Sequence, residues 1–382
     1  MQLQRLFTLA LASTATAQNA PSLTDALGSQ NSSLSTLNSL LQQNPQLLQS
    51  LNNIQNVTIL APNNDALNAV INNTDSATLL STPGYLEALL TYHVLNGTYF
   101  ASDISNTSVF IPTLLTNQSY TNVTGGQRVE AVLVDGNVTF YSAGKQNITV
   151  ETANVNFTGG TIHIVKGVLS IPQNVTDTLS NTNLTAAVGA FAAADLTQNL
   201  TGARDVTIFA PNNDAFNAIG SIVGNLTTEQ LSRIAGYHVV NGTVGYSTSL
   251  SNSTLTTENG QDITISIIDG DVFVNSARVV APDILVDNGV VHVIDQVLNP
   301  DNTSGKPDPS ATTTTAAFSS ASSGSGGIPF TSGVTTATTT FPAATSAGGG
   351  ASSSSKGVAM PMKTGAVGAA ALFGGAAMLV NL

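Results

Sequence analysis

Four aspartates in the C-terminal half of the chain come nearest to a catalytic arrangement. Paired carboxylates cleave glycosidic bonds, and such a pair could be assembled from Asp262, Asp269, Asp271 and Asp283. Asp269 and Asp271 flank a glycine, however, and aspartates are expected in such a turn for structural reasons. The chain also lacks a G-x-S-x-G elbow, a P-loop and a G-x-G-x-x-G pattern after a strand. The sequence therefore predicts no enzymatic activity.

Four histidines could serve as metal ligands or acid–base groups. His93, His163, His238 and His292 all lie inside sequence blocks that occur twice, which suggests structural roles. His292 stands between two valines without an H-E-x-x-H spacing, so a hydrogen-bonded structural histidine is the favoured interpretation. Calcium bound by the acidic turns is an alternative, but no D-x-D-x-D-G loop supports it. We expect neither a metal nor a cofactor.

The composition excludes several classes of protein. The chain has 382 residues, a net charge of −12, 8% charged residues, and neither cysteine nor tryptophan. Disulfide scaffolds, cysteine nucleophiles and cysteine–zinc sites are therefore excluded. Ten basic residues spread along the chain cannot form the dense positive surface that nucleic-acid backbones require. An apolar fraction of 42% is enough for the buried cores of roughly two or three domains.

A long repeat organises the middle of the chain. Four blocks occur twice in the same order, and the longest lies at residues 57–69 and again at 206–218. The copies are about 130 to 150 residues apart, which indicates duplication of a domain and not a short-period solenoid. We therefore predict homologous domains at residues 20–171 and 172–299.

Each domain reads as a mixture of helices and strands. Leucine and alanine patterns predict N-terminal helices around residues 34–51 and 184–196. A short β run stopped by Pro62 or Pro211 follows, and the next Asn and Asp residues supply capping oxygens for a further helix. Residues 227–230 form a capping box, and the rest reads as strand with Asp-Gly hairpin turns. The predicted fold class is α+β.

Both ends of the chain carry targeting signals. Residues 1–17 end in the A-x-A pattern that signal peptidase accepts. Residues 300–355 are rich in Thr, Ser, Ala, Gly and Pro, a composition that cannot bury enough apolar surface to fold, and they predict a disordered, O-glycosylated stalk. Residues 356–382 end in an uncharged apolar tail and predict a GPI-attachment propeptide, with a retained transmembrane span as the alternative. The expected attachment residues are Gly350, Ser352, Ser353 and Ser354.

Sequons for N-glycosylation occur at roughly seventeen places. Because the chain begins with a secretion signal, we expect several of them to carry glycans. The favoured sites are Asn56, Asn96, Asn137, Asn147, Asn199, Asn225 and Asn241. In the strands at residues 56–59 and 137–140, alternation places the asparagine and the threonine on the solvent face and the apolar residues toward the core.

Three ordered blocks, each present twice, resemble the fasciclin domain. The second copy carries TIFAPNNDAF at residues 207–216, the central Tyr-His motif at 237–238 and the closing VHVIDQVL at 291–298. The first copy has Leu60 and Leu67 in place of the aromatic residues. The resemblance covers nearly all of both predicted domains and implies, for each, a β-sandwich wedge packed with helices. Such domains occur in extracellular adhesion and matrix proteins, and the anchor and stalk resemble those of fungal and plant GPI-anchored fasciclin-like glycoproteins.

The resemblance also implies residues for partner binding. The candidates are Tyr92, His93, Tyr237, His238, Asp283 and Ile284. The Tyr-His pairs match a dipeptide implicated in integrin binding in animal relatives, although their valine-rich surroundings favour a place in the core. Asp283 and Ile284 resemble the Asp-Ile motif of animal matrix fasciclin domains, in which an aspartate after a proline presents its carboxylate to a metal-bearing receptor. The corresponding region of the first domain has Asn154 and lacks the acid.

We therefore expect a secreted, GPI-anchored cell-surface glycoprotein for adhesion or for contact with cell wall or extracellular matrix. Its expected partners are cell-wall or matrix glycans, surface proteins or further copies of the chain, with a membrane contact through the anchor and no nucleic acid. Weak contacts made by two linked domains and many copies would add up to avidity. The alternative is a ligand-binding module for a lipid or small glycan, outside the cell or on a vacuolar or endosomal membrane.

Overall fold

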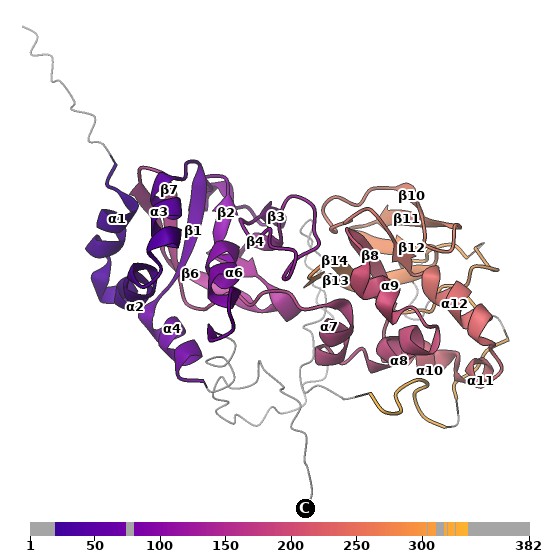
Figure 1. The fold of residues 1–382 in the computed structure, drawn as a ribbon. Helices are drawn as coiled ribbons and strands as arrows, with labels where there is room; N and C mark the ends of the chain where they lie inside the picture. Colours follow the sequence, from indigo (N-terminus) through magenta and orange to yellow (C-terminus); the bar gives the residue numbers. More distant parts are fainter. Residues whose placement is uncertain are drawn as a thin grey trace, which may run out of the picture.

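The structure is a computed structural model, and it describes residues 20–73, 80–303, 305–310, 317–318, 320–324 and 326–334. Two domains, each built of a sheet and helices, lie side by side in it (Figure 1). The predicted signal peptide, anchor residues and propeptide lie outside the described residues, as does part of the predicted stalk. In the part of the chain that is described, no helix has both the length and the apolar character needed to cross a bilayer.

Some helices of the first domain begin at residues whose side chains cap them. They are α1 (Leu23–Ser29), α2 (Asn31–Gln42), α3 (Pro45–Asn53), α4 (Asn64–Ile71) and α6 (Tyr85–Tyr92), with short 3₁₀ turns η1 (Ala101–Asp103) and η2 (Ala143–Lys145). The side chains of Ser22 and Asn63 accept backbone N–H bonds of 3.1 and 2.9 Å from three residues ahead, and so begin α1 and α4. Pro45 occupies the first turn of α3, where its missing N–H leaves no intrahelical bond unmade.

The strands of the first domain form one seven-stranded sheet. They are β1 (Val57–Pro62), β2 (Val94–Asn96), β3 (Val109–Pro112), β4 (Arg128–Val134), β5 (Asn137–Tyr141), β6 (Asn147–Phe157) and β7 (Gly160–Val165), in the order β2-β1-β7-β6-β5-β4-β3. Strand β1 runs parallel to β7, and the other neighbours are antiparallel. Strand β6 shifts register twice against β7, and such irregularities bend a strand.

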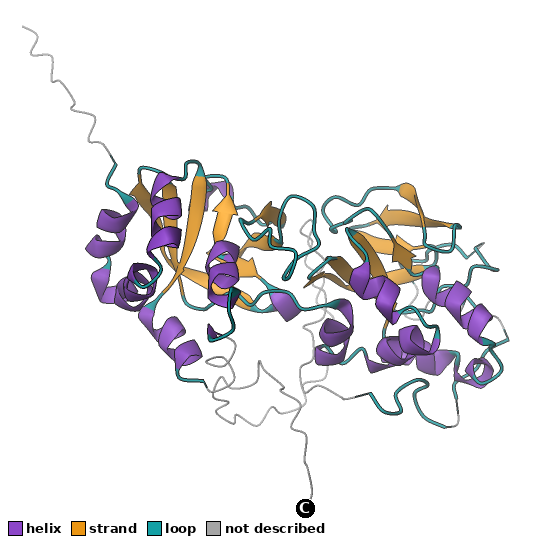
Figure 2. Ribbon diagram, in the orientation of Figure 1, coloured by secondary structure: helices purple, strands orange, loops and turns teal. Residues whose placement is uncertain are grey.

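Because of this bend the sheet folds over on itself. One hydrophobic core lies inside the folded sheet, and another lies between the sheet and the helices. Helices α1, α2 and α3 pack on one face of β1, β6 and β7. A second cluster gathers side chains from β1, β3, β4, β5 and β7, so the two ends of the sheet face each other across it. Figure 2 shows the helices gathered outside the sheet in each domain. The predicted α+β class, a β structure packed with helices in each domain, is confirmed.

The second domain repeats this architecture. Its helices are α7 (Val175–Asn181), α8 (Thr185–Ala193), α9 (Thr197–Gly202), α10 (Asn213–Ala218), α11 (Gly220–Val223) and α12 (Thr228–Gly236). Its strands are β8 (Val206–Pro211), β9 (Val239–Val240), β10 (Ser253–Thr256), β11 (Asp262–Ile268), β12 (Asp271–Val274), β13 (Ala277–Val286) and β14 (Gly289–Ile294). The strand order β9-β8-β14-β13-β12-β11-β10 is that of the first domain, and the predicted capping box at Thr227 is present.

The predicted solvent face of two strands is wrong. Thr58 and Thr139 were expected to point outward with their glycosylation asparagines, but they are 0% and 2% exposed. Strand β1 is buried along its whole length because helices cover one of its faces and the folded-over sheet covers the other. The hydroxyl of Thr58 donates a 2.8 Å bond to the carbonyl of Gly97, which satisfies it in the core.

Part of the stretch that was expected to form a stalk packs on the second domain. We call the described residues between 317 and 334 the strap. The ring of Phe330 meets that of Phe216 edge-on, with centroids 5.9 Å apart, and Phe318 also contacts the core on the helix side of the domain. The Ser221 N–H donates a 3.0 Å bond to the carbonyl of Ser322. Two phenylalanines thus pack the strap against the second domain, although the rest of the strap is too polar to be buried.

Candidate functional site

The two Tyr-His pairs lie in the core. Tyr92 and Tyr237 have no exposed surface, and their hydroxyls donate bonds of 2.9 and 2.8 Å to the carbonyls of Arg128 and Asp262 on the facing strands. Each tyrosine therefore ties the end of a helix to the far side of the folded-over sheet. A partner that touches the surface of the folded domain does not reach these rings, so burial supports the core interpretation.

The adjacent histidines join each helix to the segment that follows the last strand of its domain. The Nδ1 of His93 donates a 2.7 Å bond to the carbonyl of Leu89, and its Nε2 accepts a 2.9 Å bond from the N–H of Leu169. His238 repeats both bonds with the equivalent backbone groups, at 2.8 and 2.9 Å. Both imidazoles must be neutral for this pattern, and burial lowers the pKa of each to about 4. These histidines are structural.

The other two histidines join a β-bulge to a neighbouring loop. The Nδ1 of His163 accepts from the N–H of Asn154 at 3.2 Å, and its Nε2 donates to the carbonyl of Tyr99 at 2.9 Å. His292 does the same with Asp283 and Gly245, at 3.3 and 2.7 Å. The structural role predicted for His292 is confirmed, because both ring nitrogens are used by the backbone.

Asp283 is buried and does not present its carboxylate at the surface. The residue is 2% exposed, and its neighbour Ile284 has no exposed surface. The carboxylate accepts a 2.8 Å bond from the N–H of Ser247 and a second bond from the hydroxyl of the same residue. Ser247, His292 and Asp283 are thus neighbours, but without the connectivity of a catalytic triad, since the serine donates to the aspartate and the imidazole faces backbone groups.

The two domains meet at a junction built mainly from residues 110–128 of the first domain. The ring of Phe110 stacks on Tyr246 of the second domain, with centroids 4.3 Å apart and planes 13° apart. Gln127 is fully buried, and its side-chain amide donates a 3.0 Å bond to the carbonyl of Val286. The sequence analysis singled out neither the ring pair nor Gln127, because nothing local marks a contact between domains.

Two aspartates of the second domain complete the junction. The carboxylate of Asp205 accepts from both the N–H and the hydroxyl of Thr124, at 2.7 and 2.5 Å. The carbonyl of Asp287 accepts a 2.7 Å bond from the N–H of Asn122. Burial raises the pKa of the Asp287 carboxyl to about 6, and one of its oxygens is buried without a hydrogen-bond partner among the described residues. These contacts hold the two domains as one unit.

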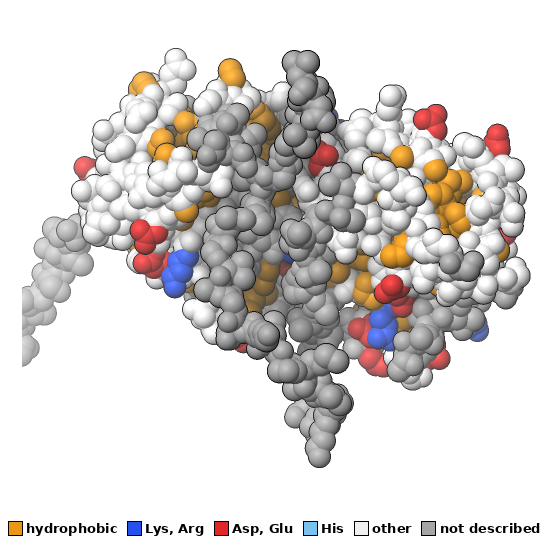
Figure 3. All heavy atoms as spheres, turned by 90° about the horizontal axis from the view of Figure 1, so that it is seen from below, with side chains coloured by type: hydrophobic (Ala, Val, Ile, Leu, Met, Phe, Trp, Pro, Cys, Tyr) orange, Lys and Arg blue, Asp and Glu red, His pale blue; other side chains and the backbone are white. Residues whose placement is uncertain are grey.

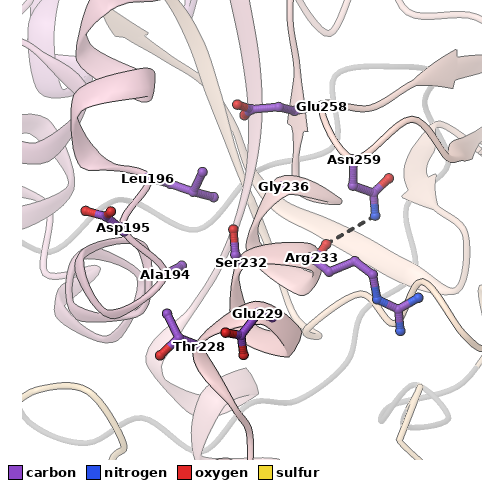
Figure 4. A pocket seen from close by; sticks show the side chains of 10 residues that line it. All are labelled: Ala194, Asp195, Leu196, Thr228, Glu229, Ser232, Arg233, Gly236, Glu258 and Asn259. Atoms are coloured by element: carbon purple, nitrogen blue, oxygen red, sulfur yellow. Dashed lines mark hydrogen bonds between the residues drawn. The ribbon is translucent and has the colours of Figure 1, made fainter.

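A pocket of about 540 Å³ opens on the helical side of the second domain (Figure 4). The exposed face of α12 forms one wall, the turn between α8 and α9 forms another, and Glu258 with Asn259 closes the third side. The amide of Asn259 donates a 3.1 Å bond to the carbonyl of Arg233, whose guanidinium pairs with Asp301. Burial raises the pKa of the Glu258 carboxyl, and a hydrogen bond from Asn199 opposes that rise. Sequence reasoning missed this pocket.

Two smaller apolar cavities lie between helices and sheet, one in each domain. Each encloses about 20 Å³, and each includes the histidine of the Tyr-His motif, His93 or His238. This is about the space of a single water molecule. In the described part of the chain, no three His, Asp or Glu side chains gather where they could hold a metal ion.

All seven favoured glycosylation asparagines are exposed. They lie in turns, at strand ends and on a short helix: Asn56, Asn96, Asn137, Asn147, Asn199, Asn225 and Asn241. Asn56 adopts a left-handed backbone with φ of 59°, and its side-chain oxygen accepts a 3.0 Å bond from the N–H of Thr98. That bond leaves the amide nitrogen free for a sugar. The structure therefore places these sites where glycosylation is sterically open.

Comparison with known proteins identifies the repeated unit. A sequence profile of the fasciclin domain matches residues 32–172 and 182–300. The chain belongs to the fasciclin-domain family. The predicted tandem pair of fasciclin domains is thereby confirmed, and the buried Tyr-His pairs and the junction described above are features of two fasciclin domains in sequence.

Two relatives and one solved structure serve for comparison with this chain. The chain is 38% identical over 283 residues to a fasciclin-like arabinogalactan protein of Arthroderma benhamiae, covering 73% of this chain and 66%, about two thirds, of that relative. It is 32% identical over 308 residues to the fasciclin-like arabinogalactan protein elcF of Phaeosphaeria nodorum, covering 80% and 96%. A FAS1 domain pair from the insect cell adhesion molecule fasciclin I aligns over 72% of this chain and 99% of that chain, with 20% identity and a TM-score of 0.36.

Proposed function

We propose that this chain is a cell-surface glycoprotein whose paired fasciclin domains mediate adhesion or contact with cell wall or extracellular matrix. The observation that carries the proposal is the junction, which holds two fasciclin domains as one body, and this body carries exposed glycosylation sequons. A body with two contact surfaces, repeated over many copies on one membrane, converts weak contacts into avidity. Partners of this kind are cell-wall or matrix glycans, surface proteins or further copies of the chain.

The surface of the pair suits such contacts. On the face drawn in Figure 3, charged side chains are few and stand in small groups of mixed sign. A surface of this kind supports many weak polar contacts and offers no concentrated charge for a nucleic acid or an acidic lipid. The name shared by the relatives, fasciclin-like arabinogalactan protein, supports a carbohydrate-bearing surface protein.

The anchor is part of the same proposal. A signal peptide at residues 1–17 and attachment within 350–354 would place the pair at the plasma membrane, or on cell-wall glucan after transfer. Treatment of intact cells with phosphatidylinositol-specific phospholipase C, followed by glucanase, should release the protein into the supernatant. Retention after both treatments, with the protein on vacuolar or endosomal membranes, would contradict surface display.

Adhesion itself is tested with the full glycoprotein clustered on beads. We expect binding to isolated cell wall, to matrix glycans or to other coated beads, rising steeply with coating density. The matched control is the double variant Phe110→Ala, Gln127→Ala, in which the two domains remain but the junction loses its ring stack and its buried amide. Its binding should fall at equal density. Coated beads that bind nothing at any density would contradict the proposal.

A lipid-binding function finds less support. The apolar cavities beside His93 and His238 enclose about 20 Å³ each. An acyl chain would have to separate the helices from the sheet and to break the histidine ties described above. Native mass spectrometry of the purified protein tests this alternative, because a bound lipid would add a discrete mass.

A further inference from the structure

We propose that the strap docks on the second domain of a neighbouring copy as well as on its own, and that this exchange joins copies of the chain. The partner is therefore a second copy, which is one of the partner classes of the adhesive function proposed above, and in that respect the inference rests on it. Exchange of an identical segment is a low-cost route to a dimer, because the monomer already contains every contact that the dimer uses.

The face of the second domain that receives the strap is shaped for a close approach of backbone. This strap-binding face lies on α8, α10 and α11, beside the strap (Figure 1), and consists of Gly189, Phe216, Gly220 and Ser221. A Cβ at Gly189 would overlap the carbonyl oxygen of Phe330, and one at Gly220 would lie 2.5 Å from the backbone nitrogen of Gly324. The strap therefore fits only where both of these positions are glycine.

One ring contact and two reciprocal hydrogen bonds hold the strap on this face. The ring of Phe330 meets that of Phe216 edge-on, with centroids 5.9 Å apart. The N–H of Ser221 donates a 3.0 Å bond to the carbonyl of Ser322, whose own N–H donates to the hydroxyl of Ser221 at 2.9 Å. All of these contacts are made between one segment and one face, so a strap that comes from another copy can repeat them.

The first domain shows the same helix face without a fit for the strap. Ser39 and Ile71 stand where the second domain has Gly189 and Gly220. The side chain of Ile71 is 37% exposed. The fold therefore does not need a cover at this place, and the side chains of the first domain would block a strap. Docking is specific to the second domain, and a strap that leaves it uncovers a face that the fold tolerates.

The connection that leads to the strap is long enough to reach a neighbouring copy. The side-chain amides of Asn299 and Asn302 donate bonds of 3.1 and 2.9 Å to the carbonyl of Ala317, where the strap begins. Between these points, the carbonyl of Pro309 accepts one exposed bond of 2.8 Å from Arg278. With these bonds released, the chain between Asn302 and Ala317 can extend to roughly 45 Å, which exceeds the roughly 30 Å diameter of a small domain.

The test uses the fact that the chain has no cysteine. Two differently tagged full-length chains, Ser221→Cys and Ser322→Cys, carry one thiol on the strap-binding face and one on the strap. Both serines are exposed, and backbone bonds join them in the docked strap, so a disulfide between the two chains reports an exchanged strap. We expect mixed-tag disulfide dimers when the two chains are mixed at high concentration under mild oxidation.

The matched control removes the rings of the strap and keeps its thiol. Adding Phe318→Ala and Phe330→Ala to the Ser322→Cys chain should lower the yield of mixed dimers at least about tenfold, because buried aromatic anchors dominate the energy of such contacts. Equal yields with and without the rings would overturn the proposal, since the thiols would then meet by random collision.

A chain that carries both cysteines separates docking from exchange. The double variant Ser221→Cys, Ser322→Cys should form an intramolecular disulfide and should then be unable to enter mixed dimers. Closure of the double variant without mixed dimers in the two-chain experiment would overturn exchange. Absence of both disulfides, with circular dichroism showing folded chains, would overturn docking as well.

Failure of exchange is distinguishable from failure of adhesion. The variant Phe318→Ala, Phe330→Ala keeps the joined pair of domains, so on beads it tests binding to cell wall and matrix glycans without an anchored strap. Absence of mixed dimers together with normal binding to cell wall would overturn exchange alone. Mixed dimers from a protein whose beads bind neither cell wall nor glycans would support exchange and contradict that part of the adhesive function.

Discussion

The bulge of strand β6 in the first domain and that of β13 in the second use the same backbone with different side chains. Asn154 and Asp283 have φ of 61° and 63°, and the N–H of each donates to the Nδ1 of a histidine. Both side chains then cap a loop, since Asn154 accepts from the N–H of Ala101 at 2.9 Å and Asp283 from that of Ser247 at 2.8 Å. A position served by a neutral amide in one copy and a carboxylate in the other requires an acceptor oxygen, not a charge.

The two copies differ in burial because only the second faces a neighbour. Asn154 is exposed, whereas Asp283 lies on β13, against which η2 of the first domain packs. Burial, and less strongly the nearby charge of Lys145 in η2, lowers the pKa of His292. Lys145 itself forms an ion pair with Glu130 at 2.8 Å. The residue that resembles a receptor-binding motif is thus enclosed at the domain junction. In this chain the Asp-Ile motif therefore stabilises the fold.

Acid should weaken both domains alike, and this is the largest expected effect. His93 and His238 have pKa values of about 4, below the usual 6.5, so the unfolded chain takes up their protons first. Their contribution to stability is therefore complete above pH 6.5 and is lost as the pH falls through 4, by about 3 kcal/mol for each histidine. Denaturant melts between pH 7 and pH 4 check this, with hydrogen exchange resolving the domains. Acid sensitivity in only one domain would show that His93 and His238 do not stabilise their domains alike.

Removal of the capping oxygen should separate the two bulges. Asp283→Ala leaves the buried N–H and hydroxyl of Ser247 without an acceptor and should cost about 3 kcal/mol, whereas Asn154→Ala, at an exposed site, should cost about 1 kcal/mol. Hydrogen exchange in β13 and in β6 measures each change locally. As a control, Asp283→Asn restores an acceptor and should recover most of the loss. Equal costs for the two alanine variants would show that burial does not distinguish them.

The junction should respond to pH with the opposite sign. Burial holds the pKa of Asp287 near 6, above the usual 3.8, so its folded form favours the proton and the junction loses stability as the pH rises from about 4 through 6. Asp287→Asn should stabilise the pair at pH 7 by about 1 kcal/mol, a figure reduced for partial exposure to solvent. Thermal melts at pH 5 and pH 7 provide the measurement. If the stability of Asp287→Asn depended on pH in the same way as that of the wild type, Asp287 would not be the group that makes the junction sensitive to pH.

The smallest effect concerns the strap, which is described only on the second domain. A Cβ at Gly189 would lie 1.8 Å from the carbonyl oxygen of Phe330, so Gly189→Ser should displace the strap. Ser39 of α2 corresponds to Gly189. The side-chain oxygen of Asn64 accepts the backbone N–H three residues before Ser39, and that of Asn213 accepts the backbone N–H three residues before Gly189. We expect faster proteolysis within residues 317–334 and a loss of about 1 kcal/mol. Ser39→Gly is the control and should change neither. Unchanged proteolysis in Gly189→Ser would show that the strap is not held there.

The sequence predicts what is local and repeated. The Asn-Asp caps, the capping box at Thr227 and the structural role of His292 follow from short patterns and are present as expected. The burial of Thr58 does not follow, because a strand covered on both faces obeys no simple alternation. The junction, the strap and the pocket join residues that are far apart in the chain. Only the fold brings Phe110 to Tyr246.

The central claim is that adhesion uses the outer surface of a joined pair of fasciclin domains and not the buried motifs. The most direct measurement compares the bead-binding curves of wild type and Asp283→Asn at matched coating density, after circular dichroism has shown both to be folded. The account predicts the same curve for both, because asparagine keeps the capping oxygen that the first domain uses. Loss of binding in the folded Asp283→Asn variant would contradict it and would assign the carboxylate a direct role in partner recognition.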